Sequence, residues 1–193
     1  MVVKKIAILF SGNGTNLQNL IEKLHNKVFD DTKIEVALTI SNKKDVYGIK
    51  RSQKFGIEPI VIENKAFSSR EEFDKELVSV IKKQNIDLVV LAGFMRILSS
   101  VFTQNVKAIN IHPSLLPLFK GANAIEESFN SDEKFGGATV HYVSEELDGG
   151  EIIIQKSFEK TLDMNIDEFE KHIHKIEYDI FPKAVMIALA KQR

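Results

Sequence analysis

Short apolar runs alternate with longer amphipathic stretches through the first half of the chain, and this alternation constrains the fold more than any other feature. The runs that we predict to be strands are residues 5–10, 34–40, 57–62, 88–92 and 108–111. The stretches that we predict to be helices between them are residues 16–25, 46–55 and 70–85. Such alternation is typical of a doubly wound α/β fold, in which helices cover both faces of a mostly parallel sheet. Ligands of such sheets bind beyond the C-terminal ends of the strands.

The second half of the chain has a different pattern. A loop punctuated by Pro113 and Pro117 precedes a predicted helix at residues 124–129 and two predicted strands at 138–143 and 151–158. Two consecutive strands joined by a turn predict an antiparallel edge on the sheet. A long amphipathic helix follows from about residue 166, and we expect it to be bent or broken at Pro182. The length of 193 residues indicates one domain, residues 1–193.

Charge and cysteine content exclude several classes of function. The chain has 26 Lys plus Arg against 27 Asp plus Glu, so it lacks the basic field of a nucleic-acid-binding protein. It contains no Cys, which removes thiol nucleophiles and fits a reducing cytoplasm. We find no apolar run long enough for a membrane span and no metal-ligand spacing. We therefore expect a cytoplasmic protein that binds small molecules, without nucleic acid, membrane or metal.

A glycine-rich loop at residues 11–16 follows the first predicted strand and precedes the first predicted helix. Backbone N–H groups at such a junction can converge on a phosphate. The loop ends without the Lys of a nucleoside-triphosphate loop, and Leu17 stands where a dinucleotide fingerprint has its third glycine. The functional interpretation is a site for a single phosphate group; the alternative is a turn with a helix cap. The candidate residues are Asn13, Gly14, Thr15 and Asn16.

Asn110 and His112 are the most informative pair of polar residues. Residues two apart on a strand face the same side, so both point from the end of the fifth predicted strand. An amide can stabilise an oxyanion and an imidazole can move a proton, which together suit acyl chemistry. Asp148, before two glycines, is a candidate third member that would orient or charge-stabilise His112. The alternatives are a structural histidine and a generic Asp-Gly-Gly turn.

Taken together, four motifs resemble those of the phosphoribosylglycinamide formyltransferase family, which is folate-dependent and belongs to purine biosynthesis. They read SGNGTNL at residues 11–17, LAGFMRIL at 91–98, NIHPSLLP at 110–117 and ELDGG at 146–150. The resemblance runs from Val3 to about Pro182. It implies a Rossmann-like formyltransferase fold that transfers a formyl group from 10-formyltetrahydrofolate to the amine of glycinamide ribonucleotide. It implies no metal, and the expected assembly is a monomer or homodimer.

The resemblance also assigns roles to residues. The implied catalytic set is Asn110, His112 and Asp148, with Thr139 and His141 in support. The implied substrate site combines the phosphate loop of Asn13, Gly14, Thr15 and Asn16 with Glu177 on the last helix. The implied folate-binding residues are Arg70, Met95, Arg96, Ile97, Leu98, Val143, Ser144, Glu145, Glu146 and Leu147. Residues 1–100 would thus form a phosphate-binding half and residues 101–193 a catalytic and folate-binding half.

One departure keeps a second enzyme class open. Residues 118–123 read LFKGAN, and Asn123 stands where familiar members have a histidine. Gly-Ala-Asn in this position resembles formyltetrahydrofolate hydrolases, although the chain has no room for their N-terminal regulatory domain. A phosphate-binding module without catalysis is a third interpretation, which leaves Asn110 and His112 unexplained. A methionyl-tRNA formyltransferase is disfavoured, because neither length nor charge provides an RNA-binding region.

Overall fold

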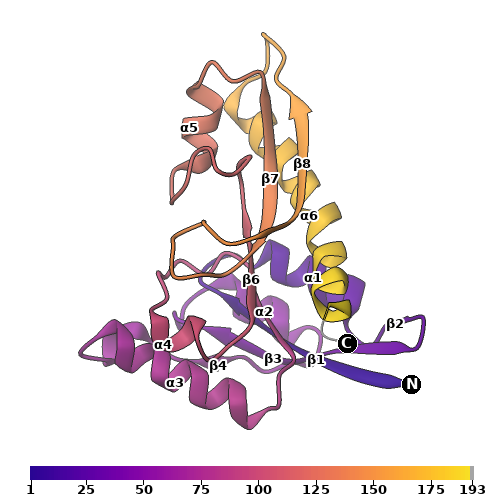
Figure 1. Ribbon diagram of the computed structural model, residues 1–193, viewed down its shortest axis with the longest axis vertical. Helices are drawn as coiled ribbons and strands as arrows, with labels where there is room; N and C mark the ends of the chain where they lie inside the picture. Colours follow the sequence, from indigo (N-terminus) through magenta and orange to yellow (C-terminus); the bar gives the residue numbers. More distant parts are fainter. Residues whose placement is uncertain (192–193) are drawn as a thin grey trace.

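The computed structural model describes residues 1–191 and is built on one eight-stranded sheet (Figure 1). The strands are β1 (Val2–Phe10), β2 (Val28–Phe29), β3 (Thr32–Ser41), β4 (Ile60–Val61), β5 (Leu88–Leu91), β6 (Ala108–His112), β7 (Phe135–Tyr142) and β8 (Ile152–Glu159). The helices are α1 (Thr15–Leu24), α2 (Tyr47–Gln53), α3 (Arg70–Lys83), α4 (Ser100–Thr103), α5 (Ala124–Asn130) and α6 (Ile166–Ala190), with a short 3-10 helix, η1 (Asn64–Ala66).

The strand order is β2-β3-β1-β5-β6-β7-β8, and β4 also pairs with β3. β4, β3, β1, β5 and β6 run parallel, whereas β7 and β8 add an antiparallel edge. This confirms the predicted α/β class and its antiparallel C-terminal edge. The chain moves outward from β1 to β3 and then returns to β5 on the other side of β1. The reversal of strand order places a crevice beyond the C-terminal ends of β1 and β5.

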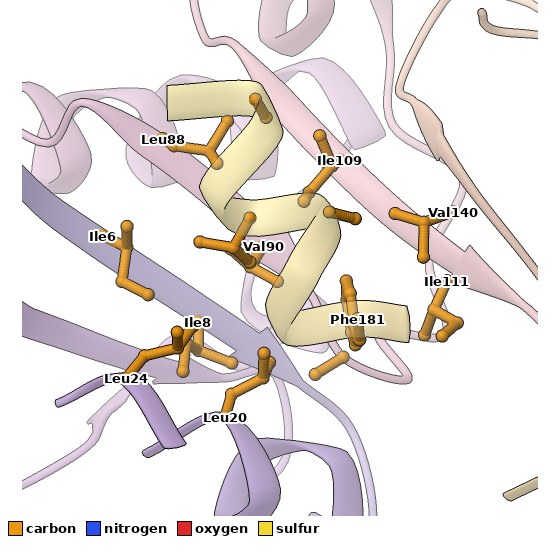
Figure 2. Close-up of a cluster of buried hydrophobic side chains, with 14 of the residues drawn as sticks. Ile6, Ile8, Leu20, Leu24, Leu88, Val90, Ile109, Ile111, Val140 and Phe181 are labelled. Carbon is orange, nitrogen blue, oxygen red and sulfur yellow. The ribbon is translucent and has the colours of Figure 1, made fainter. Parts of the chain in front are cut away.

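The continuous apolar sequence of β1 is explained by helices on both faces of the sheet. Ile6, Ile8 and Phe10 pack with residues of α1 and α6 in one buried cluster. Ala7 and Leu9 point the other way, into a second cluster built with α3 and α4. Figure 2 shows α6 lying over the first cluster. Alternation along the strand thus divides one apolar run between two cores.

The last helix continues through Pro182, so the expected break is wrong. Proline has no N–H, which leaves the carbonyl four residues earlier, that of Tyr178, without its helical donor. The Asn19 side chain of α1 donates a hydrogen bond to this carbonyl oxygen at 3.1 Å. A neighbouring helix therefore replaces the bond that the proline removes.

The start of α6 is fixed by a capping box, in which the Asn165 side chain accepts a hydrogen bond from the backbone N–H of Glu168.

Other differences lie at the sheet edge and in short elements. The strand predicted at residues 57–62 is reduced to β4, because only its last residues reach a partner, the end of β3. β2, η1 and α4 were not predicted, since each is too short to show a hydrophobic period. Within residues 1–191, no helix is both long and apolar enough to cross a membrane. The division at residue 100 into two functional halves stays a prediction.

Candidate active site

A cavity of about 350 Å³ opens beside the C-terminal end of β5. Its walls come from the segment after β5, from β6 and from the segment after β7. Asn110, His112 and Asp148 all line it. A second hollow of about 380 Å³ lies between the α4–β6 connection and Tyr142, and it contains none of the three. The chemistry-bearing residues therefore belong to the first cavity.

Asn110 and His112 share one side of β6, as their spacing predicted. The antiparallel pairing of β6 with β7 sets Asn110 opposite His141 and His112 opposite Thr139. The Asn110 amide nitrogen lies 3.3 Å from His141 Nε2. His141 Nδ1 lies 2.9 Å from the Tyr142 carbonyl oxygen, which can only accept, so Nδ1 carries a proton and Nε2 is the atom left to accept from Asn110. His141 thus orients the Asn110 amide.

Asp148 lies between the two histidines. Its Oδ2 is 3.5 Å from His112 Nδ1, and its Oδ1 is 3.6 Å from His141 Nε2. The backbone N–H of Gly121 donates to the same carboxylate at 2.9 Å. Burial opposes ionisation, but the neighbouring His141 ring, the hydrogen bond from the Gly121 N–H and the nearby His112 ring hold the pKa of Asp148 below its ordinary value. The carboxylate is therefore a buried negative charge facing His112.

The proton positions on His112 follow from its neighbours. Nε2 lies 2.7 Å from the backbone oxygen of Phe119, an acceptor, so this nitrogen carries a proton. Nδ1 lies 3.5 Å from the Asp148 carboxylate oxygen Oδ2. His112 is only 4% exposed, so both interactions occur away from bulk solvent. The ring is therefore held between the Phe119 carbonyl and the Asp148 carboxylate, on the same side of β6 as the Asn110 amide.

The glycines after Asp148 allow two backbone segments to approach closely. A Cβ on Gly150 would lie 1.7 Å from the Tyr142 carbonyl oxygen, which no side chain can tolerate. Asp148 itself has a φ of 50°, in the left-handed region that aspartate tolerates better than most residues. The turn therefore places the carboxylate against the end of β7, beside His141.

Most of the predicted folate-binding residues line this cavity. They are Met95, Arg96, Ile97, Leu98, Val143, Ser144, Glu145, Glu146 and Leu147. Arg70 is not among the lining residues; it begins α3 and its guanidinium lies 3.6 Å from the Glu71 carboxylate. The Arg96 guanidinium lies over the Phe73 ring, 5.8 Å from its centroid. The structure thus brings two of the predicted segments together and leaves Arg70 outside them.

The phosphate loop has the geometry of an uncapped helix start. Gly14 has a φ of 75° and is the N-cap of α1, where no side chain caps the first turn. A Cβ at Gly14 would lie 2.7 Å from the Gly48 Cα of α2. Both the positive φ and this close approach therefore require glycine at the position. The first-turn N–H groups, including those of Thr15 and Asn16, point out of the helix start. This is the arrangement that binds anions at helix N-termini.

Arg51 on α2 supports this loop, and local sequence patterns gave no signal for it. Its Nε donates to the Asn13 carbonyl oxygen at 2.9 Å, and a second guanidinium nitrogen lies 3.3 Å from the Asn13 side-chain oxygen. The guanidinium also bonds to Gln18 and lies 4.8 Å from the centroid of the Tyr47 ring. A positive charge is therefore fixed beside the predicted phosphate site.

Glu177 joins the loop to α6. It is 4% exposed and accepts hydrogen bonds from the Asn16 amide at 3.0 Å and from His174 Nδ1 at 2.9 Å. The bond to Glu177 raises the pKa of His174, against the effect of burial, and Glu170 acts in the same direction. The sequence could have indicated the contact between His174 and Glu177, because residues three apart on a helix lie on one face.

The chain is similar to known proteins over most of its length. The chain matches the formyl transferase family over residues 4–185. It is 40% identical to a phosphoribosylglycinamide formyltransferase of Haemophilus influenzae, over 95% of this chain and 86% of that protein. A phosphoribosylglycinamide formyltransferase structure from Campylobacter jejuni is 56% identical, with a TM-score of 0.94 over 96% of this chain and 97% of that one.

The chain is also similar to part of a larger protein. It is 41% identical to the trifunctional purine biosynthetic protein adenosine-3 of Drosophila melanogaster over 94% of this chain, which spans only 14% of that protein. The shared region is thus a small part of that relative. The family match includes both the glycine-rich loop and the residues around Asp148. This chain therefore belongs to the formyl transferase family.

Proposed function

We propose that this chain transfers a formyl group from 10-formyltetrahydrofolate to the primary amine of glycinamide ribonucleotide. The observation that supports this most is the grouping of Asn110, His112 and Asp148 in a cavity walled by residues 95–98 and 143–147. The cavity has the size of a small-molecule site, and its walls combine apolar side chains with a polar end. We also propose that the reaction takes place in the cytoplasm.

The residues fit formyl transfer without a covalent enzyme intermediate. The substrate amine attacks the formyl carbon, which forms the new C–N bond and a tetrahedral centre with an oxyanion. The Asn110 amide donates one hydrogen to His141, and its second hydrogen has no acceptor among residues 1–191, so it is available for the oxyanion. Protonated His112 stabilises the same charge, held by Asp148.

The tetrahedral centre collapses when the bond to the folate N10 breaks. The attacking amine loses a proton and N10 gains one, so the reaction needs no other acid or base overall. His112 can transfer this proton, or a water held by the Asp148 carboxylate can do so. On the substrate side, the amides of the 13–16 loop and the Arg51 charge would hold the phosphate, and Glu177 would contact the same substrate.

One assay tests the proposal. The protein is incubated with 10-formyltetrahydrofolate, with and without glycinamide ribonucleotide, and deformylation is followed by absorbance. Turnover only in the presence of the amine is the expected result. Turnover without it would instead indicate a hydrolase, an outcome of interest because Gly121 and Ala122, from the hydrolase-like stretch, line the cavity. Absence of turnover in both conditions would contradict the proposed transfer.

A further inference from the structure

Ser11 forms a junction between three loops at the point where the strand order reverses. It follows β1 directly, and its backbone N–H donates to the Gly93 carbonyl oxygen at 3.0 Å. Its hydroxyl oxygen accepts from the backbone N–H of Met95 at 2.8 Å and donates to the Asn42 side-chain oxygen at 2.6 Å. Ser11, which belongs to the loop after β1, therefore joins this loop through its side chain to the loops that follow β3 and β5.

The hydrogen bonds at this junction leave the Ser11 hydroxyl a single arrangement. Because the Met95 N–H can only donate, the Ser11 oxygen must accept, and its one hydrogen is directed to Asn42. The Asn42 amide nitrogen in turn donates to the side-chain oxygen of Asn64 at 3.2 Å. Ser11 and Asn42 are each 3% exposed, so water does not compete for these bonds. The junction is thus buried and directional.

The two sides of the junction lead to different predicted ligands. Ser11 is the first residue of the glycine-rich loop, and the carbonyl oxygen of the next residue, Gly12, accepts from the Gly48 N–H at 3.1 Å. On the other side, Met95 belongs to the wall of the folate cavity and is 68% exposed. A displacement of either segment changes the geometry at the Ser11 hydroxyl, which both share.

Other buried groups support one segment only. The Asp74 carboxylate, which is fully buried, accepts from the backbone N–H and the hydroxyl of Ser99, both at 2.6 Å. It therefore fixes the far end of the cavity wall and does not reach the phosphate loop. Arg51 fixes Asn13 and does not reach the cavity wall. Ser11 differs from both because its single hydroxyl joins the two segments.

We propose that Ser11 is a positioning residue that couples the binding of the phosphate-bearing substrate to the binding of the folate. An ordered phosphate loop holds Ser11, and Ser11 holds the Met95 backbone in the position that the cavity wall needs. Each ligand therefore binds more tightly when the other is present. This inference rests on the proposed function, because it assigns the two segments to the two substrates of that reaction.

Binding measurements without turnover test the coupling. Tetrahydrofolate carries no formyl group, so it forms a complex with glycinamide ribonucleotide that cannot react. Calorimetry gives the Kd of glycinamide ribonucleotide with and without saturating tetrahydrofolate, and the ratio of the two is the coupling factor. For the unaltered chain we expect about a 5-fold or larger factor, the range usual for coupled sites. For Ser11→Ala we expect it to fall below about twofold.

Ser41→Ala is the matched control. Ser41 is also a buried serine at the C-terminal end of a parallel strand, but its hydroxyl bonds within its own loop, to the Lys43 carbonyl oxygen at 2.6 Å. Its coupling factor should equal that of the unaltered chain. Asn42→Ala removes the acceptor of the Ser11 hydroxyl and supplies a second variant if Ser11→Ala does not fold. We expect a reduced coupling factor for it as well.

Three results would overturn the inference: no coupling in the unaltered chain, unchanged coupling in the folded Ser11 or Asn42 variant, or an equal loss in Ser41→Ala. Each of these is distinguishable from failure of the proposed function. If the function is wrong, the unaltered chain shows no amine-dependent deformylation. If only the Ser11 inference is wrong, deformylation is normal and the coupling factor does not depend on Ser11.

Discussion

The phosphate loop and the catalytic cluster are built in opposite ways. The loop at residues 13–16 uses backbone N–H groups of one short segment, made possible by Gly14 at the start of α1. The cluster uses side chains from three separate places, with Asn110 and His112 on β6, His141 on β7 and Asp148 after β7. A backbone site can be recognised in a short stretch of sequence, whereas a side-chain cluster depends on which strands become neighbours.

This difference predicts where substitutions act. Backbone amides remain when a side chain is changed, so the loop responds mainly to residues that hold its position, such as Arg51. The cluster acts through the side chains themselves, and removing one removes a group that contacts the reacting atoms. Substitutions in the cluster should lower kcat, whereas substitutions around the loop should raise KM.

The largest effect is expected from the cluster. Asn110→Ala and His112→Ala each remove a group that stabilises the oxyanion, so kcat should fall by a factor on the order of 10² to 10³. Steady-state kinetics measure this, and thermal unfolding checks that the fold is intact. His172→Ala is a matched control, because His172 stacks on Phe158 and lies outside the cavity. Near-normal activity of either cluster variant would remove that residue from the mechanism.

The phosphate side should show a smaller effect on KM. Arg51→Gln removes the charge and the bonds to Asn13, so the KM for glycinamide ribonucleotide should rise about tenfold, as for loss of a bond of about 1.4 kcal/mol. The kcat should change little, and Arg51→Lys should recover part of the loss because it keeps the charge. Glycinamide riboside, which lacks the phosphate, is the control substrate. An equal rise in KM for both substrates would show a general distortion instead.

The lowered pKa of Asp148 predicts how the free energy of unfolding depends on pH. Its pKa is lower in the folded chain than in the unfolded chain, so its carboxylate stabilises the fold above the unfolded pKa. This stabilisation is lost as the pH falls through the folded pKa. Urea unfolding should show that the stability gap between the unaltered chain and Asp148→Asn narrows below about pH 4. A gap that stays constant from pH 7 to pH 3 would contradict this.

The smallest expected effect is the contribution of His174 protonation to the stability of the fold. Its pKa is raised mainly by the bond to Glu177, so the folded state favours the protonated ring. The resulting stabilisation is present below the unfolded pKa and is lost as the pH rises through the folded pKa. Because the side chain is 38% exposed, solvent screening keeps the contribution small. NMR titration should show the His174 pKa falling in Glu177→Gln, and falling less in Glu170→Gln.

The positions of the strands could be predicted from the sequence where burial on both faces of the sheet produced long apolar runs. β1 and β5 were predicted as continuous apolar runs and α3 as an amphipathic stretch, because each contributes several side chains to a buried core. β4 was overestimated and α4 was missed, since short elements at an edge bury too few side chains to leave a pattern. The Tyr178 carbonyl, which loses its helical donor at Pro182, is bonded by Asn19, a residue of another helix, and no local sequence rule could predict this contact.

The sequence by itself determined the alternating α/β architecture, the glycine-rich loop and the pairing of Asn110 with His112, because these follow from local period, conformational freedom and strand geometry. Tertiary structure decided which distant groups meet. It placed Asp148 between two imidazoles, set Arg51 beside Asn13 and left Arg70 outside the cavity. The physical reason is that strand order and loop packing, which depend on the whole core, decide contacts between residues far apart in the chain.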